Sequence, residues 1–231
     1  MLTSHLADYH FAPTEGAKEN LLKENINPDR IMVSGNTVID ALLACVDMVR
    51  NHTFKNIENL YNVLDKDKEI ILLIMHRREN YGEGLELICE ALNELKEKTN
   101  IQIVYPVHKN PNIYVPVHDF FGKNKNIKLI EPLPYEAFVW LMDKAKIIIT
   151  DRGGIQEEAP SFGKPVLVLR EITERPESVD AGTVIIVGSN NEKIINETLE
   201  LINNKEKYHN MTLLQNPYGD GTAAKQIIKY L

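Results

Sequence analysis

Short apolar runs and amphipathic segments alternate along most of this chain. Six runs rich in isoleucine and valine have the length and composition of buried strands: Glu69–Met75, Ile101–Val107, Ile127–Ile130, Ile147–Thr150, Pro165–Leu169 and Thr183–Val187. Apolar positions recur at helical spacing in the segments between them: Gly84–Lys98, Asn112–Phe121, Tyr135–Lys144 and Gly154–Phe162. Near-continuous apolar strands that alternate with helices indicate a parallel sheet covered on both faces. The pattern therefore predicts an α/β fold with one complete doubly wound domain.

The N-terminal region does not complete a domain of the same kind. Tyr9–Pro13 and Arg30–Ser34 resemble short strands on either side of an amphipathic helix over Gly16–Asn25. Two strands and one helix are too few to enclose a second core. We therefore expect residues 1–36 to be the end of a domain whose earlier part is missing. The alternative is that these two strands extend the single sheet.

The segments on either side of the doubly wound region complete the expected organisation. A helix is predicted over Thr37–Asn51, and a polar stretch with scattered Asn and Asp follows over His52–Lys68. The tail, Glu192–Leu231, has helical spacing throughout except for a break at Asn216–Gly221. We expect the end of an N-terminal domain, an interdomain helix with linker, a C-terminal domain and a crossover helix: residues 1–36, 37–68, 69–215 and 216–231.

Composition and charge narrow the classes of partner. The net charge of −7 argues against nucleic acid as the main partner, because proteins bind a phosphate backbone through clustered positive charge. No apolar run approaches the length that spans a membrane, and residues 1–15 lack the layout of a signal peptide. Cys45 and Cys89 lie in apolar helical patterns without metal-ligand spacing, which favours core packing and a reducing compartment. A cytoplasmic location is the expectation.

The segment Ile147–Pro160 contains the strongest local indication of chemistry. Its apolar run ends at Asp151, and Gly153 and Gly154 then open a predicted helix. Paired glycines let the backbone approach a bulky ligand, and a helix start favours an anion. Ligands of open α/β sheets bind beyond the carboxyl ends of the strands, where this turn lies. With glutamates following, the pattern suggests a seat for a nucleotide-sugar phosphate; a solvated strand-to-helix turn is the equally weighted alternative.

Eight motifs, taken together in their order, resemble the non-hydrolysing UDP-N-acetylglucosamine 2-epimerases. They run through the whole chain: Phe11–Glu15, Gly35–Asp40, His76–Asn80, Tyr105–His108, Asp151–Pro160, Gly163–Val166, Thr173–Glu177 and Asn216–Gly221. Members of that family have two Rossmann-like domains in the GT-B arrangement. The resemblance implies that this chain holds one complete Rossmann-like domain and the remnant of a second.

The resemblance also implies roles for individual residues. The chemistry of each residue suits its implied role, since Arg matches phosphate oxygens and a carboxylate accepts from vicinal hydroxyls. Without the resemblance, His76–Asn80 would be interpreted as a solvated turn, His108 as a capping or surface group, and Phe138 as core. The resemblance implies that His76 contacts the substrate as a candidate catalytic residue and that Arg77 and His108 belong to a regulatory UDP-N-acetylglucosamine site. It also implies that the uracil lies near Phe138 and the ribose at Glu158. The diphosphate is implied at Arg152, Gly153 and Gly154, and the nucleotide sugar at Arg175.

The sequence departs from the family pattern at three positions near these residues. Arg152 stands where the family normally carries serine, and Ile74 and Met75 replace threonine and a small residue. These changes remove small groups from the expected ligand seat. The resemblance places the carboxylates that handle protons in the first domain, ahead of residue 1. Since acid–base catalysis needs groups within about 3 Å of the proton, we expect this polypeptide alone not to be a competent epimerase.

The function implied by the resemblance is that of an isomerase. It interconverts UDP-N-acetylglucosamine and UDP-N-acetylmannosamine by eliminating UDP to give a 2-acetamidoglucal and then adding UDP back. UDP-N-acetylglucosamine and UDP are the implied ligands, no metal or nicotinamide cofactor is implied, and full-length members are expected to be homodimers that serve surface polysaccharide synthesis. Two alternatives remain at this stage, a GT-B glycosyltransferase and a non-catalytic nucleotide-sugar binding module.

Overall fold

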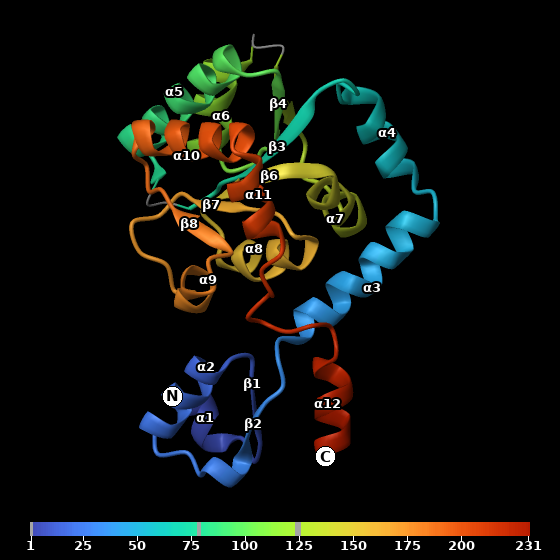
Figure 1. Ribbon diagram of the computed structural model, residues 1–231, viewed down its shortest axis with the longest axis vertical. Helices are drawn as coiled ribbons and strands as arrows, with labels where there is room; N and C mark the ends of the chain where they lie inside the picture. Colours follow the sequence, from blue (N-terminus) through green and yellow to red (C-terminus); the bar gives the residue numbers. More distant parts are fainter. Residues whose placement is uncertain (1, 78–79, 123–125) are drawn as a thin grey trace.

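The chain forms a large lobe around a six-stranded sheet and a small lobe around a two-stranded sheet (Figure 1). The structure is a computed structural model that describes residues 2–77, 80–122 and 126–231. Every pairing in the large sheet is parallel, and the strand order is β5-β4-β3-β6-β7-β8. The strands are β3 (Glu69–Ile74), β4 (Ile101–Pro106), β5 (Ile127–Ile130), β6 (Ala145–Thr150), β7 (Val166–Val168) and β8 (Val184–Ile186).

Helices cover both faces of the large sheet, because its central strands are apolar on both sides. Ile71 and Leu73 of β3 face one core, and Leu72 and Ile74 face the other. The first core is closed by α5 (Glu83–Lys98), α6 (Pro111–Phe121) and α10 (Asn191–Asn203). The second is closed by α3 (Thr37–Asn51), α4 (Lys55–Val63), α7 (Tyr135–Lys144) and α8 (Gly153–Glu158) with the 3-10 turn η3 (Ala159–Phe162).

The segment expected to be a polar stretch contains a helix instead. α4 lies within residues 52–68 and buries Leu60, while Leu64 follows it into the core. Three apolar side chains at helical spacing, including the partly buried Ile57, were enough to attach a mostly polar segment to the sheet. Burial of this narrow stripe outweighed the unfavourable Asn-rich composition, since tertiary packing overrides helix propensity.

The small lobe has its own sheet and does not extend the large one. β1 (His10–Ala12) and β2 (Ile31–Val33) pair only with each other, in parallel, so the single-sheet alternative is wrong. Around them lie three short elements, α1 (Leu2–Leu6), α2 (Glu15–Lys23) and the 3-10 turn η1 (Pro28–Arg30).

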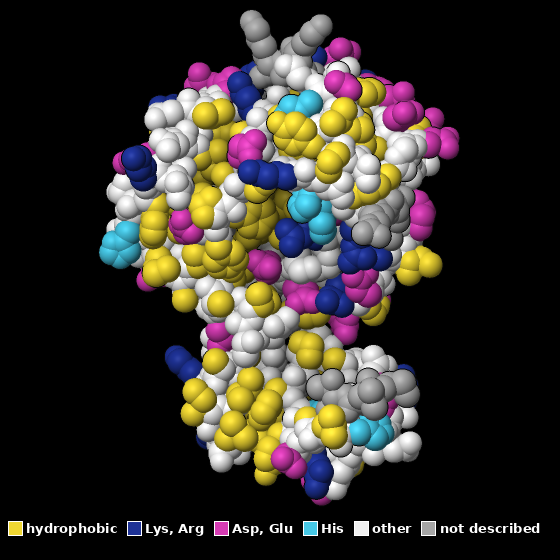
Figure 2. All heavy atoms as spheres, turned by 180° about the vertical axis from the view of Figure 1, so that it is seen from behind, with side chains coloured by type: hydrophobic (Ala, Val, Ile, Leu, Met, Phe, Trp, Pro, Cys, Tyr) yellow, Lys and Arg dark blue, Asp and Glu magenta, His cyan; other side chains and the backbone are white. Residues whose placement is uncertain are grey.

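The C-terminal helix α12 (Ala223–Tyr230) packs on the small lobe and not on the large sheet. The ring of Tyr230 makes edge contacts with Tyr9 and Phe11 at 5.7 Å between centroids, and its hydroxyl donates to the carbonyl of Asp29. On the opposite side, Ile228 is 75% exposed. Figure 2 shows hydrophobic atoms gathered on the small lobe as it is seen from behind. The apolar stripe of the helix is therefore only partly covered.

Two stretches of chain cross side by side between the lobes. The backbone N–H of Asn36 donates to the carbonyl of Tyr218 at 2.7 Å. A Cβ on Gly35 would lie 3.3 Å from the Cα of Gly219, and both glycines have positive φ, so the close crossing requires glycine. Asp40 accepts from the first two N–H groups of α12 and so fixes its start.

The remaining elements agree with the predicted pattern, with small shifts at their ends. The tail after β8 divides into α10, α11 (Lys205–Thr212) and α12, with a break at Asn204 that the spacing did not reveal. The helix α9 (Pro176–Asp180) was also not anticipated. In the described part of the chain, no helix is both long and apolar enough to cross a membrane.

Candidate nucleotide-sugar site

The candidate site lies where the connections of the large sheet change direction. β3 and β6 are neighbours at its centre, with earlier strands to one side and later strands to the other. Their carboxyl ends lead into two loops, one beginning with Met75 and His76 and the other with Asp151 and Arg152. Such a switch point is the usual ligand crevice of an open α/β sheet.

Asp151 ties the two loops together from a fully buried position. Its carboxylate accepts from the backbone N–H groups of His76 at 3.1 Å and Arg77 at 2.8 Å, and from the side-chain amide of Asn80 at 3.1 Å. The buried charge is thus stabilised by several donors. The sequence showed Asp151 only as the end of a strand, although a carboxylate directly after a buried strand was a usable signal.

A cavity of about 430 Å³ opens beside these loops. It brings together five of the predicted site residues, His76, His108, Phe138, Arg152 and Glu158, from separate segments of the chain. We call it the switch-point cavity. Its other lining residues are Ile74, Pro106, Pro132, Leu133, Tyr135 and Ile155. Apolar lining residues beside a few polar groups are typical of small-molecule sites.

Glu158 gives this cavity an unusual carboxylate. Burial raises its pKa from the ordinary value of 4.5 to about 7; the positive charge of Arg152 opposes the rise and the neighbouring Glu157 adds to it. Its Oε2 atom is buried and has no hydrogen-bond partner among the described residues. A ligand hydroxyl that donated to this oxygen would remove the cost of leaving it unpaired.

His76 faces the same cavity in a largely neutral state. Burial lowers its pKa below 6.5; Asp151 opposes this, and the positive fields of Arg152 and His108 add to it. Its Nδ1 lies 3.5 Å from Oδ1 of Asp151, and its ring centroid lies 5.8 Å from that of His108. A neutral imidazole beside a buried carboxylate is suited to exchange a proton or a hydrogen bond with a ligand.

Arg175 and the paired glycines form a second group at the start of α8. A Cβ on Gly153 would lie 3.0 Å from Oε1 of Glu174 and 3.9 Å from the guanidinium carbon of Arg175, so a larger residue there would press on the Glu174 side chain. Arg175 donates its Nε–H to the buried carboxylate of Glu157. Of the two adjacent glutamates, therefore, Glu158 faces the switch-point cavity and Glu157 fixes Arg175. Gly153, Gly154 and Arg175 are absent from the described lining of the switch-point cavity.

Glu174 was not among the site residues predicted from the sequence, but it pairs with two arginines beside the predicted phosphate seat. Its carboxylate accepts from Arg77 at 2.7 Å and from Arg170. The Arg77 side chain therefore points to this carboxylate and is absent from the described lining of the switch-point cavity. His108, which was predicted to share a regulatory site with Arg77, does line that cavity. Glu174 thus places a negative charge beside Gly153, near the predicted phosphate seat.

The three departures from the family pattern are not equivalent in the structure. Arg152 and Ile74 line the switch-point cavity, whereas Met75 packs in the core and its carbonyl accepts from the hydroxyl of Tyr105. Only the first two contribute to the wall of the switch-point cavity. Arg78 and Glu79, which belong to the same motif as His76, lie outside the described residues.

No arrangement suited to a metal ion appears in the part of the chain that the structure describes. Groups of three or more His, Cys, Asp or Glu side chains with suitable geometry are absent there. Cys45 and Cys89 are free and buried, as core packing requires.

Comparison with known proteins gives a consistent result. The chain is 51% identical to the UDP-N-acetylglucosamine 2-epimerase of Salmonella typhimurium over 233 residues, which cover 100% of this chain and 62% of the relative. It matches the crystal structure of the Neisseria meningitidis enzyme bound to UDP-GlcNAc with a TM-score of 0.92 and 48% identity, covering 99% of this chain and 62% of that one. The Methanocaldococcus jannaschii enzyme in complex with UDP-GlcNAc and UDP matches with a TM-score of 0.82 and 36% identity, covering 99% and 62%.

The sequence model of one family extends over the entire chain. It is described as UDP-N-acetylglucosamine 2-epimerase and matches residues 1–231. The chain spans about 62% of the length of the relatives named above. The family resemblance and the GT-B type fold expected from the sequence are therefore confirmed. This chain belongs to the UDP-N-acetylglucosamine 2-epimerase family.

Proposed function

We propose that this chain binds the UDP part of UDP-N-acetylglucosamine and serves the interconversion of that sugar nucleotide with UDP-N-acetylmannosamine. The observation that carries the proposal is the unpartnered Oε2 of Glu158, buried in a cavity at the switch point of the sheet. A pair of ribose hydroxyls supplies the donors that such a carboxylate lacks. Phe138 and Leu133 in the same cavity offer apolar surface to a uracil ring.

The diphosphate belongs at the start of α8 in this arrangement. The first N–H groups of a helix have no partner within the helix, and those of Gly153 and Gly154 are the first of α8. Arg175 lies beside Gly153 and supplies a guanidinium for phosphate oxygens. Glu174 carries the opposite charge and must move away from this place, releasing Arg77, before a diphosphate settles there.

His76 is the residue of this chain that we assign to the reacting end of the sugar. It lines the switch-point cavity, its backbone N–H donates to Asp151, and its imidazole is neutral near pH 7. In the elimination and re-addition of UDP, a neutral imidazole here would donate a hydrogen bond to the departing phosphate oxygen. We keep Arg77 and His108 as candidates for the regulatory UDP-N-acetylglucosamine site.

Calorimetric titration of UDP into the wild-type chain and Glu158→Ala tests the binding proposal. We expect the alanine variant to lose about 1–3 kcal/mol of binding free energy, the usual cost of removing a hydrogen bond to a charged group. Glu97→Ala is the matched control, because Glu97 is exposed on α5 and remote from both loops. Equal affinities for wild type and Glu158→Ala would remove Glu158 from the site, and no UDP binding by the wild type would refute the proposal.

Wider features follow from the proposed reaction. We infer a cytoplasmic location, where nucleotide sugars are made and where the free thiols of Cys45 and Cys89 stay reduced. We also propose that the product enters surface polysaccharide synthesis and that the active assembly is a homodimer. The glycosyltransferase alternative is supported only by the shared fold: the wall teichoic acid polymerase TagF matches with a TM-score of 0.57 at 15% identity.

A further inference from the structure

A second and larger cavity lies at the opposite ends of the central strands. Its volume is about 850 Å³, and Glu69 and Ile70 of β3 and Ala145 and Lys146 of β6 contribute to its wall at their amino ends. The switch-point cavity lies at the carboxyl ends of the same two strands, so the sheet separates the two sites. We call this second space the lysine cavity. Its size is within the range of small-molecule sites.

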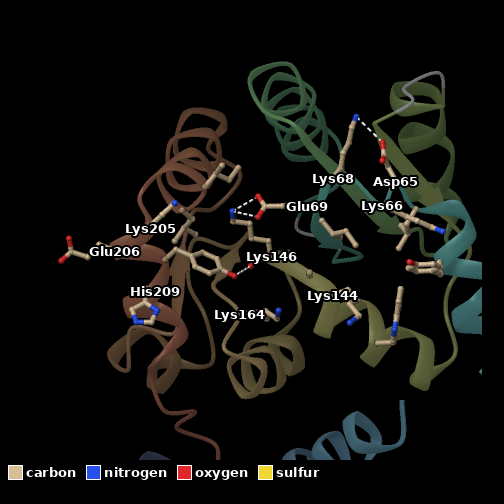
Figure 3. Close-up of a pocket in the computed structure, with 18 residues that line it drawn as sticks. Asp65, Lys66, Lys68, Glu69, Lys144, Lys146, Lys164, Lys205, Glu206 and His209 are labelled. Atoms are coloured by element: carbon tan, nitrogen blue, oxygen red, sulfur yellow. Dashed lines mark hydrogen bonds and ion pairs between the residues drawn. The ribbon is translucent and has the colours of Figure 1, made fainter. Parts of the chain in front are cut away.

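The charge of the lysine cavity is opposite to that of the protein. Its described lining contains six lysines and three carboxylates, on a chain whose net charge is −7. Figure 3 shows the lysines arriving from several elements, with Glu206 at the outer edge of the group. They are Lys66, Lys68, Lys144, Lys146, Lys164 and Lys205.

Only some of these lysines are neutralised by neighbours. Lys146 pairs with both carboxylate oxygens of Glu69 at 2.7 and 2.8 Å, and Lys68 donates to the side chain of Asn126 at 2.7 Å. Lys144, Lys164 and Lys205 form no hydrogen bond or ion pair with any described residue. Three cations thus surround one space without counterions of their own in the described chain.

Of these three lysines, Lys164 gives the strongest indication of an anion site. It is half-buried, and burial lowers its pKa, an effect that Asp143 opposes. Asp143 is already engaged in an ion pair with Arg50 at 2.6 Å. A partly desolvated cation whose nearby carboxylate serves another residue is a natural place for an external anion.

Helix stabilisation explains only one of the three free lysines. Lys144 is the last residue of α7, where a cation favours the helix dipole. Lys205 is instead the first residue of α11, where a cation is unfavourable. Lys164 lies in the turn between η3 and β7, outside any helix.

Aromatic and aliphatic groups form the rest of the wall. The rings of Trp140 and Tyr61 meet edge to face at 6.3 Å, and Tyr208 lines the cavity from α11. The Nζ of Lys66 lies 4.4 Å from the centre of the Tyr61 ring. A ligand that fits this wall combines a flat ring with several negative charges, since rings stack on aromatic faces and oligophosphates match grouped lysines.

We propose that the lysine cavity is a second binding site, for a nucleoside oligophosphate. Its base packs against Trp140 and Tyr61, and its phosphates bind among Lys144, Lys164 and Lys205. This site is independent of the switch-point cavity and takes its ligand from the other edge of the sheet. β3 and α7 contribute lining residues to both cavities, so these two elements connect the second site with the switch-point cavity.

The chain carries its own reporter for this site. Trp140 is its single tryptophan, so the intrinsic tryptophan fluorescence observes the lysine cavity directly. We would titrate ATP and, separately, inorganic pyrophosphate into the wild type, the double variant Lys164→Gln/Lys205→Gln, the single variant Lys205→Gln and the control Lys225→Gln on α12. Circular dichroism spectra establish that each variant is folded.

We expect ATP to change the fluorescence saturably and more tightly than pyrophosphate, with affinity falling as salt rises. The double variant should bind at least about tenfold more weakly, because two charge-assisted contacts are lost, while Lys225→Gln should match the wild type. Lys205 is exposed, so Lys205→Gln gives a folded variant with an intermediate loss even if the double variant fails to fold. The absence of a saturable change, equal binding by both lysine variants and wild type, or equal affinity for pyrophosphate and ATP would overturn the proposal. Because UDP binding at the other cavity is measured by calorimetry with Glu158→Ala, failure of either proposal is distinguishable from failure of the other.

Discussion

Glu158 and Arg152 together set the electrostatics of the switch-point cavity. The buried carboxylate has its pKa raised to about 7 by burial, and the exposed arginine beside it opposes that rise. At neutral pH the carboxylate is therefore divided between its two protonation states. Its ability to accept two ribose hydroxyls, which requires ionisation, should increase as the pH rises through 7.

The raised pKa of Glu158 has a direct consequence for stability. Below pH 4.5 both the folded and the unfolded chain hold this proton; between 4.5 and about 7 only the unfolded chain releases it, so stability falls as pH rises. Well above pH 7 the full cost, about 3 kcal/mol, is present. Glu158→Gln should therefore unfold at higher urea concentration than wild type at pH 8 and show little difference at pH 4.5. The exposed control Glu97→Gln should give a pH-independent result, and a glutamine effect that is equal at both pH values would contradict the assignment.

Arg152 is the residue at which this chain departs most from the family pattern. Its side chain lines the switch-point cavity, and its bulk occupies space near the proposed diphosphate. We expect Arg152→Ser to tighten UDP binding in calorimetry, with Arg30→Ser in the small lobe as control. The titration belongs at pH 8.5, because losing Arg152 also raises the pKa of Glu158 and would mask the gain at neutral pH. Weaker binding with reduced salt sensitivity would show that Arg152 is a phosphate ligand instead.

At the scale of elements, the two central loops are held by one side chain. Asp151 accepts from the loop after β3 through two backbone N–H groups and the amide of Asn80. Asp151→Ala should reduce the free energy of unfolding in urea by about 2–4 kcal/mol, because several buried donors lose their acceptor. Asp180→Ala on α9 is the control, since Asp180 is exposed and should change stability by less than about 0.5 kcal/mol. A small effect at Asp151 would mean that the loops hold their places without it.

Sequence periodicity predicted the strands whose side chains are buried on both faces. It did not predict the elements that are held by only a few apolar contacts. The strands β3 to β8 are apolar on both faces, and that property is visible in the sequence. The helix α4 depends on three apolar side chains in a polar segment, and its burial is decided by α7 and the sheet, which lie far away in sequence. In the candidate site, motif order singled out His76 and Glu158, and both line the switch-point cavity. No local pattern shows that Glu174 pairs with Arg77 and Arg170; the contact with Arg77 spans 97 residues.

The whole molecule consists of a well-packed lobe and a sparsely packed one. Apolar side chains near both termini remain in solvent, among them Leu6 at 84%, Ile228 at 75% and Leu231 at 76% exposure. We expect fast hydrogen exchange in residues 1–36 and 221–231 and slow exchange in residues 69–190, because local stability follows apolar burial.

The chain should also self-associate as its concentration rises, which sedimentation would measure. Ile228→Lys should reduce that association, whereas Val63→Lys, at an apolar position on the large lobe that is 51% exposed, should not. Uniform protection in a monomer would show that the chain is a self-sufficient domain.

The paired crossing at Gly35 and Gly219 limits how the lobes are able to move. Two flexible connections placed far apart would stop the lobes from turning, and a single one would let them turn in every direction. Here the two connections are joined by the hydrogen bond from Asn36 to Tyr218 and lie in backbone contact. We therefore expect them to act as one short pivot. Beside it, the hydroxyl of Thr14 donates to Glu177 across the lobes at 2.7 Å, and this hydrogen bond would have to break for the lobes to open. A single opening and closing motion, about an axis through two glycines, is the motion that we expect from this connection.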